Sequence, residues 1–372
     1  MERHHIIALS LLAIVAAVCT LAGREFLRMH EPDEIIPGPG VTSIGSLSTY
    51  FEALAGTSSD TKVYILDSGK PGATALVLGG THPNEPAGFM TAVVLTEHIS
   101  VQEGRLIVIP QVCSSGFTCT DPLEGYPQSF SIQSKSKVRS FRFGARGSNP
   151  ITEWPDPLVF LQYPSGQQLS GNEVRNLNRS YPGRPDGTVT ERVAYAVMQL
   201  IEREKVDIAF DLHEAAPEIP IINAIVTHEK GKDAAASALF TLESENLQYA
   251  LEMSPPNFHG LSHREWGDRS PVFPYLMETS NPIQGRLRGV TNEALVVQGI
   301  DQKYYEAAQI GSMRITYDLA GEPLARRVGR HLRGLQALLG AYMEFMPEKR
   351  IVVEGIPAYE EIVARGLGEY LH

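Results

Sequence analysis

The stretch Ala75-Leu-Val-Leu-Gly-Gly-Thr-His-Pro-Asn-Glu-Pro-Ala-Gly88 decides the fold of this chain. Four apolar residues followed by two glycines are typical of a buried strand that ends in a sharp turn. Pro86 favours a helix over residues 86–99, because a missing N–H costs nothing in the first turn of a helix. The stretch therefore predicts a strand, a turn that carries His82 and Glu85, and a helix.

Strand-like and helix-like segments alternate on both sides of this unit. Apolar runs bounded by Gly and Pro predict further strands at residues 63–67, 105–111, 206–213 and 271–278. Helical spacing of apolar residues predicts helices at residues 188–205, 234–251 and 318–345. Such interleaving implies an α/β fold, with a mixed, mostly parallel sheet that has helices on both faces.

The beginning of the chain differs in composition from the rest. Arg3 precedes residues 6–23, which carry no charge and are mostly Leu, Ile, Val and Ala. This pattern predicts an export signal peptide. The run is also close to the ~20 residues that span a bilayer, so an uncleaved N-terminal membrane anchor is the alternative. We expect an exported protein, periplasmic or anchored facing outside the cytoplasm, with membrane contact only through this segment.

Composition predicts the remaining boundaries along the chain. Pro and Gly are frequent after the leader, as in linkers, and no internal repeat is visible. The four predicted parts are a leader at 1–23, a linker at 24–40, one domain at 41–346 and a C-terminal tail at 347–372.

The charge balance excludes one class of partner. The chain has 43 acidic and 32 basic residues and a formal net charge of -11. A nucleic-acid-binding protein needs a broad basic face, so we expect no nucleic-acid partner.

The segment between residues 111 and 172 has little periodicity, and loops of that length are usually functional or disordered. Within it, residues 125–152 contain no acidic residue. The basic residues there are Lys135, Lys137, Arg139, Arg142 and Arg146. Two interpretations stay open: the loop folds over a cleft and attracts anionic substrates, or its charges pair with the acidic body.

Two cysteines lie in the same segment, Cys113 and Cys119. In an oxidising compartment they could close a small disulfide loop. Two ordinary buried thiols are the alternative.

Two histidines and one glutamate lie where predicted strands end. His82 and Glu85 are three residues apart at the turn, and His213 ends the strand at 206–213. In open α/β sheets, ligands bind beyond the carboxyl ends of strands. Two His and one Glu with an open fourth position are the ligand set of a catalytic zinc, although other metals accept the same ligand types. The pattern predicts Zn²⁺ on these three residues.

A third segment, Arg175-Asn-Leu-Asn-Arg-Ser-Tyr-Pro-Gly183, carries two arginines four residues apart. Arg179 with Asn178 beside it can form a planar clamp for a carboxylate or an oxyanion. A solvent-exposed loop is the alternative interpretation of this segment.

These three motifs, in this order, resemble the zinc- and substrate-binding signature of the succinylglutamate desuccinylase/aspartoacylase family, which is related to zinc carboxypeptidases. The resemblance extends from about residue 60 to about residue 280. It implies a zinc-carboxypeptidase-like fold and zinc on the His, Glu and His named above. It also implies that Asn178 and Arg179 hold a substrate carboxylate, and it matches Arg175 to the first arginine of the family motif.

The chain departs from this family pattern at two positions and at one end. Pro83 stands where the family usually has Gly, and Asn176 stands where its motif has Asp. The family also carries a β-rich C-terminal domain, whereas this chain is expected to end in a long helix and a short tail. These departures leave the zinc chemistry intact and the substrate open.

The resemblance requires a glutamate on a late strand, about sixty residues beyond the second histidine. Glu278 fits that spacing and lies on the strand predicted at 271–278. Glu265 is nearby but lies in a stretch predicted to be a charged loop, residues 263–268, where we expect a solvated role. Asp211 shares a strand face with His213 and either supports the site electrostatically or is structural.

Together these residues predict a zinc-dependent amide hydrolase that deacylates an N-acyl amino acid or a similar carboxylate-bearing small molecule or peptide. Glu278 is the expected general base, and Arg175 is the expected donor to the oxyanion. The first alternative is an exported metallocarboxypeptidase that acts on peptides, including cell-wall peptides. An inactive binding module on the same fold is the alternative from another class.

Overall fold

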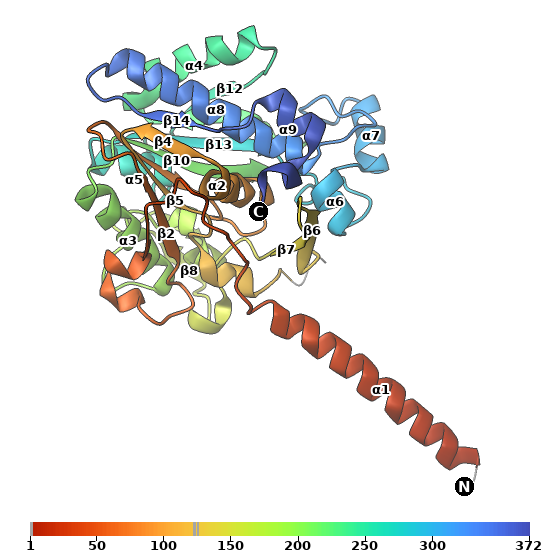
Figure 1. Ribbon diagram of the computed structural model, residues 1–372. Coiled ribbons are helices and arrows are strands. Elements are labelled where there is room, and N and C mark those ends of the chain that lie inside the picture. The colour runs from red at the N-terminus through yellow and green to blue at the C-terminus, as the bar shows by residue number, and fades with distance from the viewer. Residues whose placement is uncertain (1–2, 122–123, 125) are drawn as a thin grey trace.

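An eight-stranded mixed sheet forms the centre of the computed structural model, which describes residues 3–121, 124 and 126–372 (Figure 1). Its strands, in spatial order, are β1 (Ser43–Ser46), β2 (Lys62–Asp67), β5 (Arg105–Ile109), β3 (Thr74–Leu78), β10 (Ile208–Ala215), β13 (Phe273–Ser280), β11 (Ala224–Thr227) and β12 (Ala250–Met253). The four central strands are parallel. Antiparallel pairs join β1 to β2, β2 to β5 and β13 to β11. The predicted fold class is confirmed.

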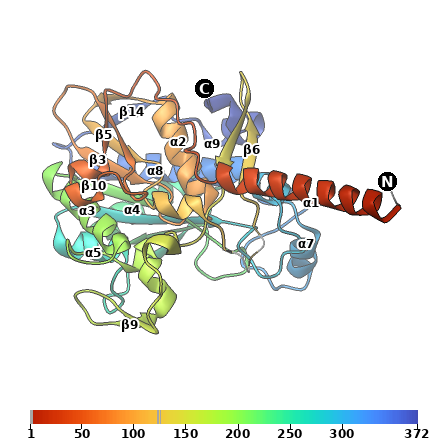
Figure 2. The same cartoon turned by 90° about the horizontal axis from the view of Figure 1, so that it is seen from below.

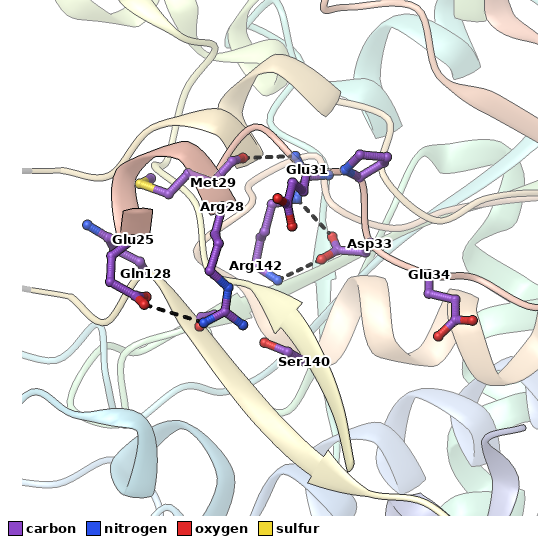
Figure 3. A pocket seen from close by; sticks show the side chains of 11 residues that line it. Glu25, Arg28, Met29, Glu31, Asp33, Glu34, Gln128, Ser140 and Arg142 are labelled. Carbon is purple, nitrogen blue, oxygen red and sulfur yellow. Dashed lines mark hydrogen bonds and ion pairs between the residues drawn. The ribbon is translucent and has the colours of Figure 1, made fainter. Parts of the chain in front are cut away.

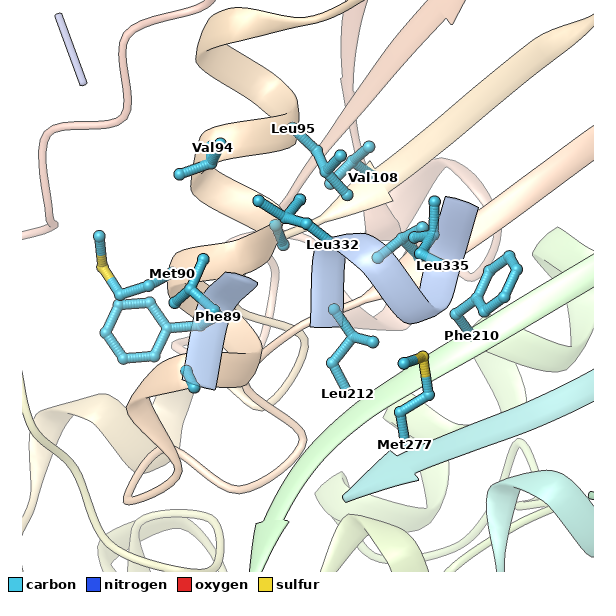
Figure 4. Close-up of a cluster of buried hydrophobic side chains, with 14 of the residues drawn as sticks. Phe89, Met90, Val94, Leu95, Val108, Phe210, Leu212, Met277, Leu332 and Leu335 are labelled. Atoms are coloured by element: carbon cyan, nitrogen blue, oxygen red, sulfur yellow. The ribbon is translucent and has the colours of Figure 1, made fainter. Parts of the chain in front are cut away.

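Helices cover both faces of this sheet because its central strands are apolar on both sides. Along β3, Ala75 and Val77 contribute to one core cluster, whereas Leu76 and Leu78 contribute to the other. The first cluster lies under α2 (Pro86–His98), α4 (Lys232–Ser244) and α8 (Leu324–Phe345). The second lies under α3 (Val189–Arg203) and includes the tryptophan of α5 (Ser262–Arg269). Figure 4 shows side chains of α2 and α8 meeting those of β10 and β13 in the first cluster.

Shorter elements surround these layers (Figure 2). The small strand pairs are β4 (Ser100–Glu103) with β14 (Val352–Glu354), β6 (Ser129–Gln133) with β7 (Val138–Arg142), and β8 (Val159–Leu161) with β9 (Gln168–Ser170). The other α-helices are α1 (Arg3–Arg28), α6 (Glu293–Gln298), α7 (Gln302–Gln309) and α9 (Tyr359–Arg365). The 3-10 turns are Leu47–Thr49, Glu52–Leu54, Ser114–Thr118, Pro150–Thr152, Gly171–Arg175, Leu177–Arg179, Glu229–Gly231 and Leu367–Tyr370.

Three predicted element boundaries were wrong. The helix expected at 234–251 ends at Ser244, because Asn246 adopts a left-handed conformation (φ 60°) and the chain then enters β12. The helix expected from residue 318 begins at Leu324, after Pro323. The charged stretch at 263–268 is helix α5 rather than a loop.

The ends of the domain also differ from the prediction. Residues 347–372, expected as a tail, pack into the domain: β14 pairs with β4, and Ile351 and Ile362 are buried in the first core cluster. The expected linker is partly helical, since α1 continues to Arg28, and Met29 is only 4% exposed. Apolar side chains at these positions account for both differences, because each gains burial against the domain.

Helix α1 projects from the domain with all of its side chains outside the core (Figure 1). Its 26 residues include an 18-residue window of mean hydropathy 2.6. By length and composition the helix can cross a membrane, and it is equally compatible with a signal sequence.

Candidate metal centre

Three buried side chains converge where β3 and β10 end and α2 begins. His82 Nδ1 lies 2.8 Å from Glu85 Oε1, and His213 Nδ1 lies 3.0 Å from Glu85 Oε2. The two Nδ1 atoms are 3.1 Å apart. All three side chains are about 2% exposed, and one ligand atom from each lies within 4.8 Å of the others. The structure therefore brings together the three residues predicted as metal ligands.

Two glycines allow this convergence. Gly80 has φ +67°, a conformation that other residues rarely adopt, and it lets the chain turn sharply after β3. Gly88 lies in α2 against β10, where a Cβ would be 2.3 Å from the carbonyl oxygen of Leu212. The close approach of α2 to β10 brings Glu85 next to His213.

The outward nitrogen of each histidine faces an acceptor. His82 Nε2 lies 2.9 Å from Asn176 Oδ1, and His213 Nε2 lies 3.0 Å from Asp211 Oδ2. The Asn176 oxygen accepts a hydrogen bond from His82 Nε2, which leaves the Nδ1 lone pair directed at the common point beside Glu85. The Asp211 carboxylate lies near His213 Nε2 without a hydrogen bond of standard geometry, and its negative charge favours a proton on that nitrogen. Histidines that bind metals are usually held in this way, so the donor set fits a zinc ion.

The electrostatics of the site also favour a cation at that point. Burial and the charge of Arg146 together lower the pKa of His82 to about 4, although Glu85 acts in the opposite direction. Burial lowers the pKa of His213 as well, but Asp211 and Glu85 outweigh this and hold it well above its usual value. Burial raises the pKa of Glu85, yet the two imidazoles keep it well below its usual range. The carboxylates thus attract positive charge to this buried point.

Glu278 lies beside the predicted ligands on the neighbouring strand. It is the register partner of His213 in the parallel β10–β13 pair, so the two side chains share one face of the sheet. Its Oε2 is shielded from solvent and has no hydrogen-bond partner in the described part of the chain. Burial raises its pKa to about 8, with Glu85 adding to the effect. Such a carboxyl group can exchange a proton near neutral pH.

The long basic segment supplies one residue to the site. Arg146 Nη1 donates to Glu85 Oε1 at 3.0 Å, and its side chain is 45% exposed. The other four cations of the segment pair with acidic residues elsewhere. These pairs are Lys135–Glu369, Lys137–Glu34, Arg139–Glu97 and Arg142–Asp33. The interpretation that these charges pair with the acidic body therefore holds for those four residues, and attraction of anionic substrates stays a prediction.

The structure does not bring Arg175 to the candidate metal site. Its Nε and Nη2 donate to the two carboxylate oxygens of Asp156 at 2.7 and 3.0 Å, and its Nη1 donates to the carbonyl oxygen of Ser148. This two-point pairing occupies the guanidinium, so the geometry does not place it where an oxyanion would form.

The predicted substrate-binding residues, Asn178 and Arg179, lie beside the start of α5 and the turn before it. Asn178 Oδ1 accepts from the Ser262 backbone N–H at 2.8 Å. Arg179 donates to the Asn178 carbonyl oxygen at 2.7 Å, and its guanidinium lies 5.2 Å from the centre of the Phe258 ring. Burial lowers the pKa of Arg179, while the carboxylates of Glu173, Glu278 and Glu85 act in the opposite direction.

Glu265 is not solvated, contrary to expectation. It is 1% exposed, lies 2.9 Å from His259 Nδ1 and accepts from Arg269 Nε. It lies in the first turn of α5 rather than in a loop, and its buried carboxylate ties the helix to the preceding turn.

The two cysteines of the long segment are free thiols in this structure. Cys113 is buried, and Cys119 is partly exposed with its Sγ 3.7 Å from the Gly116 carbonyl oxygen. The alternative of two thiols, rather than a disulfide, describes this geometry.

Sequence reasoning missed several contacts of Glu85. Gln284 Nε2 donates to Glu85 Oε1 at 3.2 Å, and the Glu214 backbone N–H donates to Glu85 Oε2 at 3.0 Å. The Glu214 side chain forms a fully buried pair with Arg327 at 2.6 Å. Only Glu214 had a signal in the sequence, since it directly follows a predicted ligand.

Comparison with known proteins gives partial matches. No family model matches the chain. Over 160 residues, the chain is 26% identical to N-alpha-acetyl-L-2,4-diaminobutyric acid deacetylase of Halomonas elongata. These residues make up 42% of this chain and 33% of that enzyme. A succinylglutamate desuccinylase structure from a Silicibacter species matches with 17% identity and a TM-score of 0.41, covering 75% of this chain and 60% of that one. A metallo-carboxypeptidase from Burkholderia cenocepacia matches with 12% identity and a TM-score of 0.45, covering 82% and 66%.

The resemblance stated from the motifs is confirmed by the sequence match to the deacetylase. The solved structures that match the chain also include an aspartoacylase family protein from Mesorhizobium loti. The matched part spans about a third of the length of the deacetylase.

Proposed function

We propose that the chain is a zinc-dependent hydrolase that cleaves the amide bond of an N-acyl amino acid or a similar carboxylate-bearing substrate. One observation carries this proposal: two imidazole Nδ1 atoms and a carboxylate converge on one buried point, and an oxygen atom lies within 3.0 Å of the other nitrogen of each imidazole. Zinc bound there by His82, Glu85 and His213 would polarise the amide carbonyl and lower the pKa of a water molecule to about 7.

Glu278 is the proposed general base. Its unpartnered Oε2 lies on the same sheet face as His213, where it can take a proton from the attacking water. The same oxygen would then return the proton to the leaving amine nitrogen. A carboxyl group whose pKa burial has raised is suited to both transfers.

For the oxyanion we propose Arg146 in place of Arg175. Arg146 reaches the ligand Glu85, and nearly half of its side chain remains accessible, whereas the Arg175 guanidinium is occupied by Asp156. A preorganised cation at the carbonyl oxygen typically supplies several kcal/mol in the transition state.

Asn178 and Arg179 are proposed to bind the substrate carboxylate. The backbone of Ser262 holds the Asn178 side chain, and Arg179 is mostly buried between Glu173 and Phe258. A guanidinium held in this way can orient a carboxylate at a set distance from the scissile bond. We also propose export, with α1 as the membrane-crossing segment.

A substrate comparison tests the reaction class. Zinc-loaded protein is assayed against N-acetyl and N-succinyl amino acids, against their methyl esters, and against short peptides with a free C-terminus. We expect hydrolysis of N-acyl amino acids, a large loss of kcat/KM for the esters, and loss of activity with a chelator. Faster hydrolysis of the peptides would assign the chain to the metallocarboxypeptidases, and no turnover of any substrate would support an inactive binding module.

A further inference from the structure

An exposed apolar surface lies on the β8–β9 hairpin and the turn before it. We name it the hairpin patch. Its side chains, all exposed, are Ile151, Trp154, Leu158, Val159, Leu161 and Tyr163. Trp154 is 71% exposed and Leu158 is 99% exposed. Six apolar or aromatic side chains gathered within thirteen residues differ from isolated surface residues, and such patches mark interaction surfaces.

Strand β8 is apolar on both of its faces. Phe160 points inward and is buried, whereas Val159 and Leu161 on either side of it point outward. A strand with one solvated face normally has polar residues on that face. Strand β9 is the only strand that pairs with β8 within the described sheets, and in the described part of the chain the outward face stays exposed. The outer face of β8 is therefore free to contact an apolar surface outside the chain.

A bilayer crossed by α1 is the apolar environment nearest to the domain. The residues that follow α1 are held against the domain by hydrogen bonds. Arg142 donates to the Met29 carbonyl oxygen and to the Asp33 carboxylate, each at 3.2 Å (Figure 3). Further along, the Ile36 backbone N–H donates to the buried Glu97 carboxylate at 3.0 Å. A bilayer that holds α1 must therefore lie directly beside the domain.

The hairpin patch and α1 also lie on the same side of the domain. In Figure 1, β8 lies on the lower side, from which α1 leaves; in Figure 2, which views that side from below, β9 and α1 lie at different edges of it. Trp154 and Tyr163 at the ends of the patch are the residue types enriched where membrane meets water.

We propose that α1 is retained as a membrane anchor and that the hairpin patch rests on the surface of the same bilayer. The domain then contacts the membrane at two places, the end of α1 and the hairpin. This proposal goes beyond the hydrolase function and does not depend on it, because it concerns only where the folded domain lies.

Tryptophan fluorescence of the full chain in vesicles tests the proposal. The chain has two tryptophans, Trp154 in the patch and the fully buried Trp266. In phosphatidylcholine vesicles, we expect lipids brominated near the headgroup end of their acyl chains to lower the Trp154 emission at least about twofold. The control Trp154→Phe, which leaves only Trp266, should show no quenching.

A double variant keeps the test specific to the patch. Leu158→Asp with Leu161→Asp should abolish the quenching of Trp154 while the protein stays in the vesicles, because α1 is unchanged. Equal emission in brominated and ordinary lipids would overturn the proposal. So would protection of Trp154 from aqueous acrylamide in detergent micelles with a dimeric mass, which would assign the patch to a second copy. A mature protein that lacks α1 would also overturn it.

Discussion

The ends of the central strands and the long segment between β5 and α3 contribute to the candidate site in different ways. At the strand ends, His213 and Glu278 share a sheet face because they are register partners in adjacent parallel strands. In the long segment, Arg146 reaches the site whereas Arg175, in a recognised motif, is turned to Asp156. Sheet register fixes a strand-end side chain, but contacts distant in sequence fix a loop side chain.

The two regions also differ in what they do. The strand ends and the start of α2 supply buried groups that can hold and activate a metal, and the long segment supplies a half-exposed cation that a substrate can reach. We therefore expect variants at the strand ends to affect metal binding and proton transfer. Variants of Arg146 should instead affect substrate binding and the stability of the transition state.

The largest effect is expected at a predicted ligand. His213→Ala should weaken zinc binding by more than the 10–100-fold that loss of an outer partner costs, and should abolish activity with the fold retained. His98→Ala, an exposed histidine at the end of α2, is the matched control and should keep its zinc. Metal content and circular dichroism of both purified variants measure this. Full zinc occupancy in His213→Ala would show that the strand ends do not hold the metal.

Glu278→Gln should lower kcat by about 10² or more and leave zinc content and KM nearly unchanged, because only proton transfer is removed. The base acts when ionised, so activity should rise with pH through its pKa. Burial raises that pKa from 4.5 to about 8 and a bound cation lowers it, which places the acid limb between these values. Glu278→Gln should lose that limb. An unchanged pH profile of kcat/KM would assign the proton transfer to another group.

Arg146→Ala and Arg175→Ala compare two arginines of the same segment. Arg146→Ala should lower kcat/KM by about 10²-fold, as loss of an oxyanion donor does, with the melting temperature unchanged. Arg175→Ala should leave kcat/KM within about threefold and lower the free energy of unfolding by about 1–2 kcal/mol, because it breaks a partly buried pair with Asp156. Steady-state kinetics and urea denaturation separate them. The reverse pattern would restore Arg175 to the oxyanion role.

The smallest effect is expected at the two residues that face the outward nitrogens of the histidines. Asp211, beside His213, is charged, and Asn176, beside His82, is neutral. Asp211→Asn should weaken zinc affinity by about 10-fold or more, because the imidazole of His213 becomes less basic. Asn176→Asp should strengthen zinc affinity by up to about 10-fold through His82. Competition with a chromogenic chelator measures both. Identical shifts in the two variants would show that these acceptors do not tune the ligands.

The strand–turn–helix unit around residues 75–88 could be predicted because its signals are local. An apolar run, two glycines and Pro86 each act within a few residues, and β3 and α2 form as expected. Strands β11 and β12 could not be predicted in this way. They are four residues each and are defined by pairing with β13 and with each other, not by their own composition.

The candidate site was predictable to a similar degree. The ligands follow from strand ends, and Glu278 follows from the family resemblance and its place on a strand. Asn176 facing His82 and Arg146 on Glu85 are instead contacts across 94 and 61 residues. A single sequence carries no local signal for such contacts. The family motif marks the position of Asn176, but only the structure shows which side chain it meets.

The location of the metal tests the central claim most directly. Crystals of the zinc-loaded full chain are measured at wavelengths on either side of the zinc absorption edge, and an anomalous difference map is calculated. The account predicts one zinc peak per chain, at about 2.0–2.2 Å from Nδ1 of His82, Nδ1 of His213 and a carboxylate oxygen of Glu85. A zinc peak bound by other residues, or none between these three side chains, would contradict it.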